Sequence, residues 1–361
     1  MKILHIISRL NKGGTSTWLN TLTKAKLTGF EQYLCFGKID SNELEDTFYK
    51  TRKFKKLKYM QRPINPFYDF LAFFEIRKII KQINPQIINT HTFKAGLIGR
   101  LAARSVSKKI RVIHTFHGHL IYGYYATFLS KIIITIEKLL SHFTDEFIVN
   151  GTQVKKDLIK KGVGKKKKFT VINPGVEIPK KSFNKTILRK KFKISPKLTV
   201  IGWLGRLSEI KNPLVVKEIA GELPEQLFLI GGEGQLKKKI ELDAPENVHL
   251  LGWVKPEDFW PMCDIALLTS KNEATPYALV EAASFGLPIV ASNVGSVSDI
   301  VKSKNGFLVE EKDSYVKSIR KMVGNKKLSF RMGIESKNIW KTQFSVNQFQ
   351  NRHKEVYNFL K

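Results

Sequence analysis

The sequence predicts an α/β protein with two parallel β-sheets, one in each half of the chain and each covered by helices. Two observations predict this fold class. Short apolar runs alternate with longer amphipathic segments along the whole chain, as in repeated strand–helix units. A chain of 361 residues, 42% hydrophobic and 26% charged, is also too long for one small core, so its length favours two folded domains.

Six short apolar runs in the first half predict strands at Ile3–Ser8, Tyr33–Gly37, Ile87–His91, Val112–Phe116, Phe147–Asn150 and Phe169–Ile172. The amphipathic segments between them predict helices at Ser16–Ala25, Pro66–Ile83, Ala95–Ser107, Phe128–His142 and Gln153–Lys161. This alternation favours a Rossmann-like domain, in which helices cover both faces of a parallel sheet.

The alternation pauses at Asn173-Pro174-Gly175 and through a basic stretch to about Pro196, where we place the domain boundary. It resumes with predicted strands at Thr199–Leu204, Leu227–Gly231, Val248–Gly252, Asp264–Ser270, Pro288–Ser292 and Gly306–Val309. Two aromatic-rich helices follow at about Lys327–Phe344 and Val346–Leu360. The predicted division is 1–175, 176–343 and a C-terminal helix at 344–361. Ligands of open α/β sheets bind beyond the carboxyl ends of the strands, so we expect the site in a cleft between two facing sheets.

The chain is strongly basic, with 62 Lys and Arg against 31 Asp and Glu, a formal charge of +31. Residues 1–178 hold 32 of the basic and 12 of the acidic residues, so most of the excess lies in the first half. Such a field attracts a lipid surface, a nucleic acid or a phosphorylated small molecule, and charge alone does not choose among them.

Nothing in the sequence indicates secretion or a membrane span. The N-terminus lacks a small-residue cleavage site, and no run of about 20 apolar residues occurs. Cys35 and Cys263 form neither a CxxC pair nor a metal-ligand spacing. We therefore expect two reduced thiols and a cytoplasmic protein.

The segment Ser270–Ser292, SKNEATPYALVEAASFGLPIVAS, carries a predicted anion site. Pro276 suits the first turn of a helix, because its missing N–H costs nothing there. The N–H groups of Tyr277, Ala278 and Leu279 are then free at the helix start. The helix dipole adds to them, so this position predicts a diphosphate site.

Two acids accompany this helix start. Glu273 precedes the helix, nearer a sugar, and Glu281 lies eight residues further on, where its carboxylate can accept bonds from ribose hydroxyls. The alternative is an ordinary surface loop with two solvated acids. The spacing of Pro276, Gly286 and Pro288 favours the functional interpretation.

This segment resembles the E-x7-E signature of retaining GT-B glycosyltransferases of the family-4 type, in a form close to ExxPxxxxEAxxxGxP. Gly202–Asn212, GWLGRLSEIKN, resembles the family's G-R-x-x-x-x-K-[NG] element, and its basic pair is Arg206 and Lys211. Gly231–Gly234 resembles the family's glycine turn and contains Glu233, which we expect at the nucleotide.

The first half carries weaker matches to the same family. Gly13 and Gly14 follow the first strand at the start of a helix. Because glycine has no side chain, a ligand can approach the backbone closely there. HTFHG, residues 114–118, resembles the family's sugar-contacting histidine segment, which makes His117 the predicted contact. His91, His114 and His119 lie near it in the pattern, and a core-edge histidine bonded to backbone is the alternative for His117.

The resemblance implies two Rossmann-like domains facing across a cleft, the GT-B fold, with a C-terminal helix crossing back to the first domain. It implies transfer of a hexose-type sugar from a nucleotide-diphosphate sugar with retention of configuration. Arg206 and Lys211 then stabilise the charge of the leaving diphosphate. The alternative interpretation is that Arg206 and Lys211 are ordinary surface cations, two of the 62 basic residues of the chain.

We expect no cofactor and no metal, because the chain has no Asp-x-Asp and the helix start and basic pair can replace a cation. The expected donor is a UDP-sugar rather than a GDP-sugar. The expected acceptor is a lipid-linked or polysaccharide intermediate of bacterial cell-surface glycan synthesis.

Basic and aromatic stretches at Arg52–Lys58 and Leu120–Leu140, the latter with Tyr122, Tyr124, Tyr125 and Phe128, motivate a hypothesis of peripheral binding to an anionic membrane. A generally basic protein with a buried aromatic helix is the alternative. Two other functions stay open: a nucleic-acid-binding protein, which leaves Glu273 and Glu281 unexplained, and an epimerase or hydrolase on the same fold. Nucleic acid is not the partner we expect.

Overall fold

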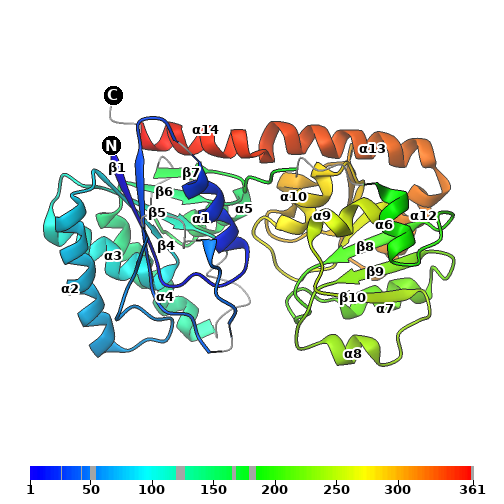
Figure 1. Cartoon of the computed structure of the whole chain (residues 1–361), viewed down its shortest axis with the longest axis horizontal. Helices are drawn as coiled ribbons and strands as arrows, with labels where there is room; N and C mark the ends of the chain where they lie inside the picture. The colour runs from blue at the N-terminus through cyan, green and yellow to red at the C-terminus, as the bar shows by residue number, and fades with distance from the viewer. Residues whose placement is uncertain are drawn as a thin grey trace. The chain divides into compact units, whose positions relative to one another are not determined.

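The computed structural model describes residues 1–25, 27–41, 43–48, 54–118, 127–164, 168–178 and 184–358. Its contacts separate two units (Figure 1): Met1–Gly175 with the segment that begins at Val346, and Val176–Ser345. Each unit contains one parallel sheet between helices, so the prediction of two Rossmann-like α/β domains is confirmed. None of the described helices is both long and apolar enough to cross a membrane.

The first unit has a seven-stranded sheet in the order β3-β2-β1-β4-β5-β6-β7, with every neighbouring pair parallel. Its strands are β1 (Lys2–Ile7), β2 (Glu31–Phe36), β3 (Phe54–Lys56), β4 (Ile87–His91), β5 (Arg111–Phe116), β6 (Glu146–Val149) and β7 (Phe169–Val171). Its helices are α1 (Gly14–Lys24), α2 (Pro66–Ile83), α3 (Phe93–Val106), α4 (Thr127–Leu140), α5 (Thr152–Lys160) and α14 (Val346–Tyr357).

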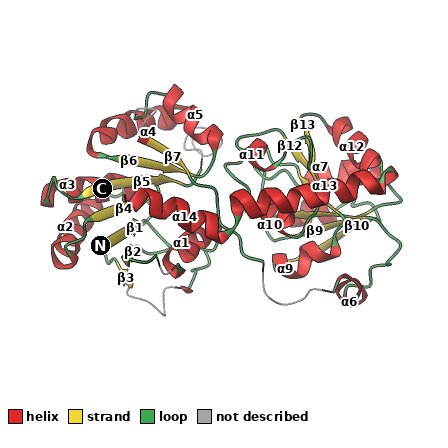
Figure 2. Ribbon diagram, turned by 90° about the horizontal axis from the view of Figure 1, so that it is seen from above, coloured by secondary structure: helices red, strands yellow, loops and turns green. Residues whose placement is uncertain are grey.

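Helices cover both faces of this sheet (Figure 2). On one face α2 and α3 place Ile76 and Ala102 against Ile6 of β1. On the other face α1 contributes Trp18, and α14 contributes Tyr357 to the same apolar cluster. The C-terminal helix α14 is therefore part of the first unit, although it follows the whole second unit in sequence.

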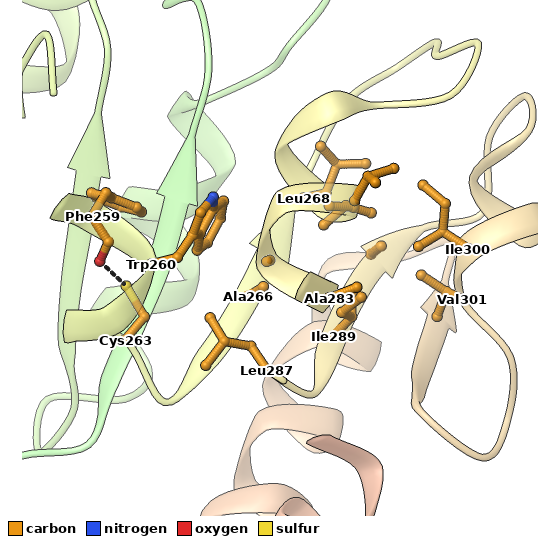
Figure 3. Packing of buried hydrophobic residues seen from close by; sticks show 14 of the residues in the cluster. Phe259, Trp260, Cys263, Ala266, Leu268, Ala283, Leu287, Ile289, Ile300 and Val301 are labelled. Carbon is orange, nitrogen blue, oxygen red and sulfur yellow. Dashed lines mark hydrogen bonds between the residues drawn. The ribbon is translucent and has the colours of Figure 1, made fainter. Parts of the chain in front are cut away.

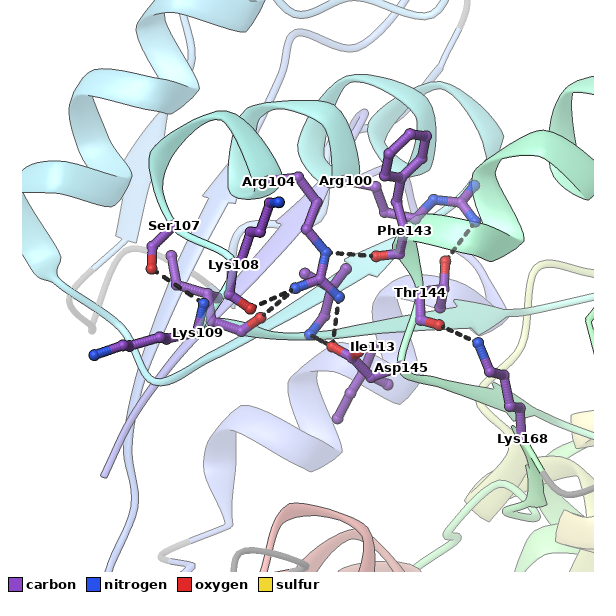
Figure 4. A network of polar contacts seen from close by, with 12 residues as sticks. Arg100, Arg104, Ser107, Lys108, Lys109, Ile113, Phe143, Thr144, Asp145 and Lys168 are labelled. Atoms are coloured by element: carbon purple, nitrogen blue, oxygen red, sulfur yellow. Dashed lines mark hydrogen bonds and ion pairs between the residues drawn. The ribbon is translucent and has the colours of Figure 1, made fainter.

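Arginines of α3 fix the end of the sheet where β5 and β6 begin (Figure 4). Arg104 donates to the carbonyl oxygens of Lys108, Ile110 and Phe143 and to the carboxylate of Asp145, at 2.7 Å. Arg100, fully buried, binds both carboxylate oxygens of a buried glutamate of α4 at 2.8 Å. These contacts stabilise the amino ends of the strands, opposite to the end where ligands of such sheets bind.

The second unit has a six-stranded sheet in the order β10-β9-β8-β11-β12-β13, again parallel throughout. Its strands are β8 (Val200–Leu204), β9 (Leu227–Gly231), β10 (Val248–Gly252), β11 (Ile265–Leu268), β12 (Ile289–Ser292) and β13 (Gly306–Val309). Its helices are α6 (Lys185–Lys191), α7 (Leu214–Gly221), α8 (Lys237–Glu241), α9 (Pro256–Phe259), α10 (Tyr277–Ser284), α11 (Val297–Ile300), α12 (Lys312–Gly324) and α13 (Lys326–Ile339).

One of the two cores of the second unit lies beneath α10 (Figure 3). Trp260, Leu268, Ala283 and Ile289 pack there with no more than a few per cent of each side chain exposed. The apolar residues of α10 face this core, which fixes the helix against β11 and β12 and leaves its first turn beyond the end of β11.

Strand β3 was not predicted. The sequence there is basic, FKK, and belongs to the stretch 52–58 that suggested a membrane-binding surface. The structure makes its described part an edge strand paired with β2, in which Lys55 and Lys56 are exposed and the following Leu57 is fully buried. Arg52 and Lys53 lie outside the described residues.

The strand order of each sheet changes direction once in sequence, between β1 and β4 in the first unit and between β8 and β11 in the second. Ligands of doubly wound sheets bind at such switch points, beyond the carboxyl ends of the strands. The loops that follow β1, β4, β8 and β11 are therefore where each unit can hold a ligand.

Candidate active site

Two loops of the second unit are held together at its switch point. The hydroxyl of Thr269, just after β11, accepts the indole N–H of Trp203 at 3.0 Å and donates to the carbonyl of Asn212 at 2.9 Å. The N–H of Lys271 donates to the carbonyl of Ile210 at 2.8 Å. The segment after β8 is therefore fixed beside the segment after β11.

This arrangement brings together two of the predicted catalytic residues. The ammonium of Lys211 lies 2.5 Å from Oε1 of Glu273, and the hydroxyl of Ser270 donates to the same oxygen at 2.6 Å. Glu273 is 8% exposed and the Lys211 side chain 29%. The carboxylate is thus neutralised within the protein, while the ammonium keeps an exposed side and further N–H groups for a ligand.

Arg206 lies in the same loop as Lys211 but is exposed, and within the described part of the chain it forms no ion pair. The structure therefore places it at the switch point without fixing its guanidinium. An exposed, unpaired arginine remains able to reach an anion at this end of the sheet.

The predicted glycine turn packs closely against the loop after β8. A Cβ at Gly232 would lie 1.8 Å from the carbonyl oxygen of Gly205, and one at Gly234 2.4 Å from that of Leu207. Gly232 also has φ at 135°, which side chains rarely adopt. Glu233 between them is half exposed, and its carboxylate is paired with Lys237 at 3.1 Å.

The helix start differs from the prediction by one residue. Pro276 is the N-cap of α10 and not its first helical residue, with φ −71° and ψ 116°. The N–H of Leu279 therefore bonds to the carbonyl of Pro276 at 3.1 Å and is not free, which corrects the prediction for Leu279. The N–H groups of Tyr277 and Ala278 donate to no described residue, so two amides remain for an anion instead of three.

A close contact positions the loop before α10. Gly295, after β12, has φ 53°, and a Cβ on it would lie 1.7 Å from the carbonyl oxygen of Glu273. The N–H of Ser296 donates to the carbonyl of Ala274 at 3.2 Å. The sequence prediction did not include Gly295, although its place after a predicted strand was a signal.

Glu281 lies one turn into α10 and is half-buried. Burial raises the pKa of its carboxyl to about 7, the Trp260 side chain opposes this rise, and the nearby Glu257 adds to it. Burial also raises the pKa of Tyr277, with Glu281 as a further cause. The Tyr277 hydroxyl is buried and has no hydrogen-bond partner among the described residues, which makes it a polar group available to a ligand.

In the first unit, Gly13 and Gly14 lie after β1 at the start of α1. Gly13 has φ 156°, both glycines are exposed, and a Cβ at Gly13 would meet nothing within 4 Å. The backbone there is accessible, as the sequence predicted, and no side chain caps the helix.

His117 follows β5 and is half-buried. Its Nε2 lies 2.8 Å from Nδ1 of His91, and the Trp18 ring packs edge-on against it at 5.3 Å between centroids. His114 instead lies in the core facing α3, where Nδ1 contacts the hydroxyl of Thr90 at 2.8 Å. His119 lies outside the described residues, and the described residues contain no group of three or more side chains placed to hold a metal ion.

Two family models match successive parts of the chain. The model of Glycosyltransferase Family 4 matches residues 17–179, and that of Glycosyl transferases group 1 matches residues 184–339. The solved structure of HepE from Anabaena, in complex with UDP and glucose, has a TM-score of 0.84 to this chain at 19% identity, covering 100% of both chains. That likeness establishes the fold.

Curated relatives include bacterial glycosyltransferases of lipid-linked, O-antigen and capsular glycans. The UDP-Gal:alpha-D-GlcNAc-diphosphoundecaprenol alpha-1,3-galactosyltransferase of Escherichia coli is 27% identical over 315 residues, covering 82% of this chain and 81% of that protein. The capsular polysaccharide biosynthesis glycosyltransferase CapM of Staphylococcus aureus is 25% identical over 322 residues, covering 84% of each. The chain belongs to the GT-B glycosyltransferases of the family-4 type.

Proposed function

We propose that this glycosyltransferase moves a hexose from a UDP-sugar to a hydroxyl of a lipid-linked or polysaccharide intermediate, with retention of configuration and without a metal ion. One observation carries the proposal: the Lys211–Glu273 pair lies at the carboxyl end of β11, directly before the open start of α10. A cation and two free backbone amides thus occur where a nucleotide diphosphate binds such a sheet.

In this proposal the amides of Tyr277 and Ala278 bind the diphosphate, and Lys211 and Arg206 contact the oxygens that become negative. Glu281 accepts the ribose hydroxyls in its charged form. Glu273 holds Lys211 in place and lies nearer the sugar, and Glu233 and the glycine turn lie at the nucleotide. His117, Gly13 and Gly14 are the first-unit groups proposed to contact the sugar.

The proposed reaction requires charge stabilisation more than a protein nucleophile. The bond from the sugar C1 to the diphosphate oxygen breaks, and the acceptor oxygen bonds to C1 on the same face. The acceptor proton passes to the departing diphosphate oxygen. Cations held before the reaction at that oxygen lower the barrier, since no solvent must reorganise around the new charge.

The acceptor class is inferred from the relatives. The printed name of the Escherichia coli relative specifies UDP-galactose as donor and a diphosphoundecaprenol-linked sugar as acceptor. That likeness and the basic first unit support a lipid-linked acceptor presented at an anionic membrane surface.

Helix α2 offers a surface for this membrane contact. Phe67, Phe70 and Phe74 follow the i, i+3, i+7 spacing of one helix face and are 68%, 62% and 46% exposed. Lys78 and Lys81 continue along the same helix and are exposed. Aromatic rings beside lysines suit the boundary between headgroups and acyl chains. Tyr122, Tyr124 and Tyr125 of the predicted membrane surface lie outside the described residues, whereas Phe128 at the start of α4 is 75% exposed.

The donor is tested by thermal stabilisation with UDP, GDP, ADP, UDP-glucose, UDP-galactose and a single-stranded oligonucleotide. A ligand at one hundred times its Kd adds about 2.7 kcal/mol to stability. We expect uridine nucleotides to raise Tm, Lys211→Met to abolish the rise, and EDTA to leave it unchanged. Stabilisation by the oligonucleotide alone, or loss of turnover with EDTA that Mg²⁺ restores, would contradict the proposal. The anomeric configuration of the product, read by NMR, tests retention.

A further inference from the structure

A chain of hydrogen bonds crosses the first unit from Gln32 to His117. Nε2 of His5 lies 3.1 Å from Oε1 of Gln32, and Nδ1 of His5 lies 3.2 Å from Nε2 of His91. Nδ1 of His91 then lies 2.8 Å from Nε2 of His117. The four side chains come from β2, β1, β4 and the end of β5, which are adjacent in the sheet. His5 and His91 are fully buried.

The Gln32 end of this chain has a fixed direction. Its amide nitrogen donates to the carbonyl oxygens of Leu22 and Ala25, both at 3.1 Å. A reversed amide would place its oxygen against these two acceptors, which cannot donate to it. The amide oxygen of Gln32 therefore faces His5 as an acceptor.

This direction propagates through the imidazoles, because a neutral imidazole carries one donor and one acceptor nitrogen. His5 must donate from Nε2 to Gln32, so its Nδ1 accepts. His91 must then donate from Nε2 to His5, and its Nδ1 accepts from Nε2–H of His117. The remaining nitrogen of His117, Nδ1, carries no proton, and it forms no hydrogen bond to any described residue.

The surroundings keep the three rings neutral. Burial lowers the pKa of His5 to about 4 and that of His117 to about 3, and burial with neighbouring histidines lowers the pKa of His91. Trp18 of α1 packs edge-on against His117 and against His353 of α14, and burial lowers the pKa of His353 as well. At neutral pH none of these rings therefore takes up a second proton, which would turn its accepting nitrogen into a donor and disrupt the order of the hydrogen bonds.

We infer that Gln32, through His5 and His91, fixes His117 in the tautomer whose Nδ1 is a hydrogen-bond acceptor. Gln32, His5 and His91 are then positioning residues. If His117 contacts the donor sugar, which rests on the proposed function, it recognises a hydroxyl that donates to it and disfavours a carboxylate at that position. The tautomer itself does not depend on the proposed function.

Two-bond ¹H–¹⁵N correlation spectra of the full chain with ¹⁵N-labelled histidine test the tautomer without any substrate. We expect His5, His91 and His117 all to show protonated Nε2 and unprotonated Nδ1, with the His117 signal assigned by its loss in His117→Gln. A His117 signal with protonated Nδ1 would overturn the inference.

Variants at Gln32 test the cause. Gln32→Met keeps the length of the side chain and removes the acceptor, so we expect the ¹⁵N shifts of all three rings to move toward averaged tautomers. Gln86→Met is the matched control, because Gln86 lies at the same amino end of the sheet and its side chain bonds the backbone groups of Lys2 and Asn84, outside the histidine chain. Unchanged His117 shifts in folded Gln32→Met would refute the role of Gln32.

The two proposals can fail separately. Native tautomers without transfer from any UDP-sugar would reject the proposed function alone. Sugar transfer by a protein whose His117 carries its proton on Nδ1 would reject the inference about the His117 tautomer alone. If Gln32→Met does not fold, the spectrum of the native protein still decides the tautomer.

Discussion

Replacing Lys211 by methionine separates its structural role from its proposed catalytic role. The substitution leaves the Glu273 carboxylate, 8% exposed, without the ammonium that neutralises it, while the Ser270 hydroxyl still donates to it. Breaking a buried ion pair by removing one partner costs about 3–5 kcal/mol. Lys211 is 29% exposed, which lets water reach the pair, so we expect about 2 kcal/mol. That loss lowers the Tm of a unit of this size by roughly 4–8 °C.

The rate should fall further than stability explains. Removing a charge-stabilising group at a leaving oxygen costs about 10²–10³ in kcat. The double variant Lys211→Met/Glu273→Gln removes the unpaired charge and should recover most of the Tm, but not the rate. Tm by calorimetry and kcat with a saturating UDP-sugar measure the two effects. Recovery of both in the double variant would refute the proposed contact of Lys211 with the diphosphate, and an unchanged Tm in Lys211→Met would refute the buried pair.

Three further outcomes are expected. The pKa of Glu281 is raised to about 7, and its charged form is proposed to bind ribose, so UDP affinity should increase from pH 6 to pH 8. The folded protein holds this proton more tightly than the unfolded chain. Its stability should therefore fall between pH 4.5 and pH 7, as the buried carboxyl ionises. Titration calorimetry at three pH values measures this, and Glu281→Gln should flatten the affinity profile; a flat profile in the native protein contradicts it. Gly295→Ala should lower unfolding free energy by about 2 kcal/mol or more, because its Cβ would overlap the Glu273 carbonyl, whereas Gly221→Ala, with open space around its Cβ, should cost almost nothing in the same urea titration. Replacing Phe67, Phe70 and Phe74 by serine should reduce flotation with anionic vesicles without lowering Tm, since all three rings are exposed; equal flotation of native and variant protein rejects α2 as the membrane contact.

Most of the fold could be predicted because hydrophobic periodicity reports burial directly. Ile87–His91 is buried throughout and Gly306–Val309 is buried or half-buried throughout, so both stand out as short runs, and their predicted bounds match β4 and β13. Strand β3 had no such signal. An edge strand needs one buried side only, and Phe54–Lys56 contributes two exposed lysines.

The site was predictable where its residues are close in sequence. Glu273, Pro276 and Glu281 fall within nine residues, so a short loop and the first turns of one helix bring them together. The error at Leu279 arose from the position of one residue. Both the N-cap and the first turn of a helix accept a residue without an N–H, so the sequence did not distinguish them. Pro276 is the N-cap, and this changes the number of free amides by one.

The chain from Gln32 to His117 could not be found in this way. Directly bonded members of this chain lie as many as 86 positions apart in sequence, as His5 and His91 do, and only the strand order β2-β1-β4-β5 makes them neighbours. Gln32 in particular has no signal in the sequence, since a glutamine in a half-buried strand is equally compatible with a solvated surface. Contacts of this kind depend on sheet topology and not on local pattern.

The basic residues behind the net charge of +31 fall into two groups, those bonded within the fold and those exposed to a binding partner. Arg100, Arg104 and Arg189 are used within the fold, where they bind carboxylates and backbone carbonyl oxygens. Removing any of them should destabilise the protein and leave anion binding unchanged. The exposed Lys78 and Lys81 on α2 contribute little to packing. Their replacement should therefore leave Tm unchanged and weaken binding to anionic vesicles by about 1 kcal/mol per lysine, an effect that high salt removes.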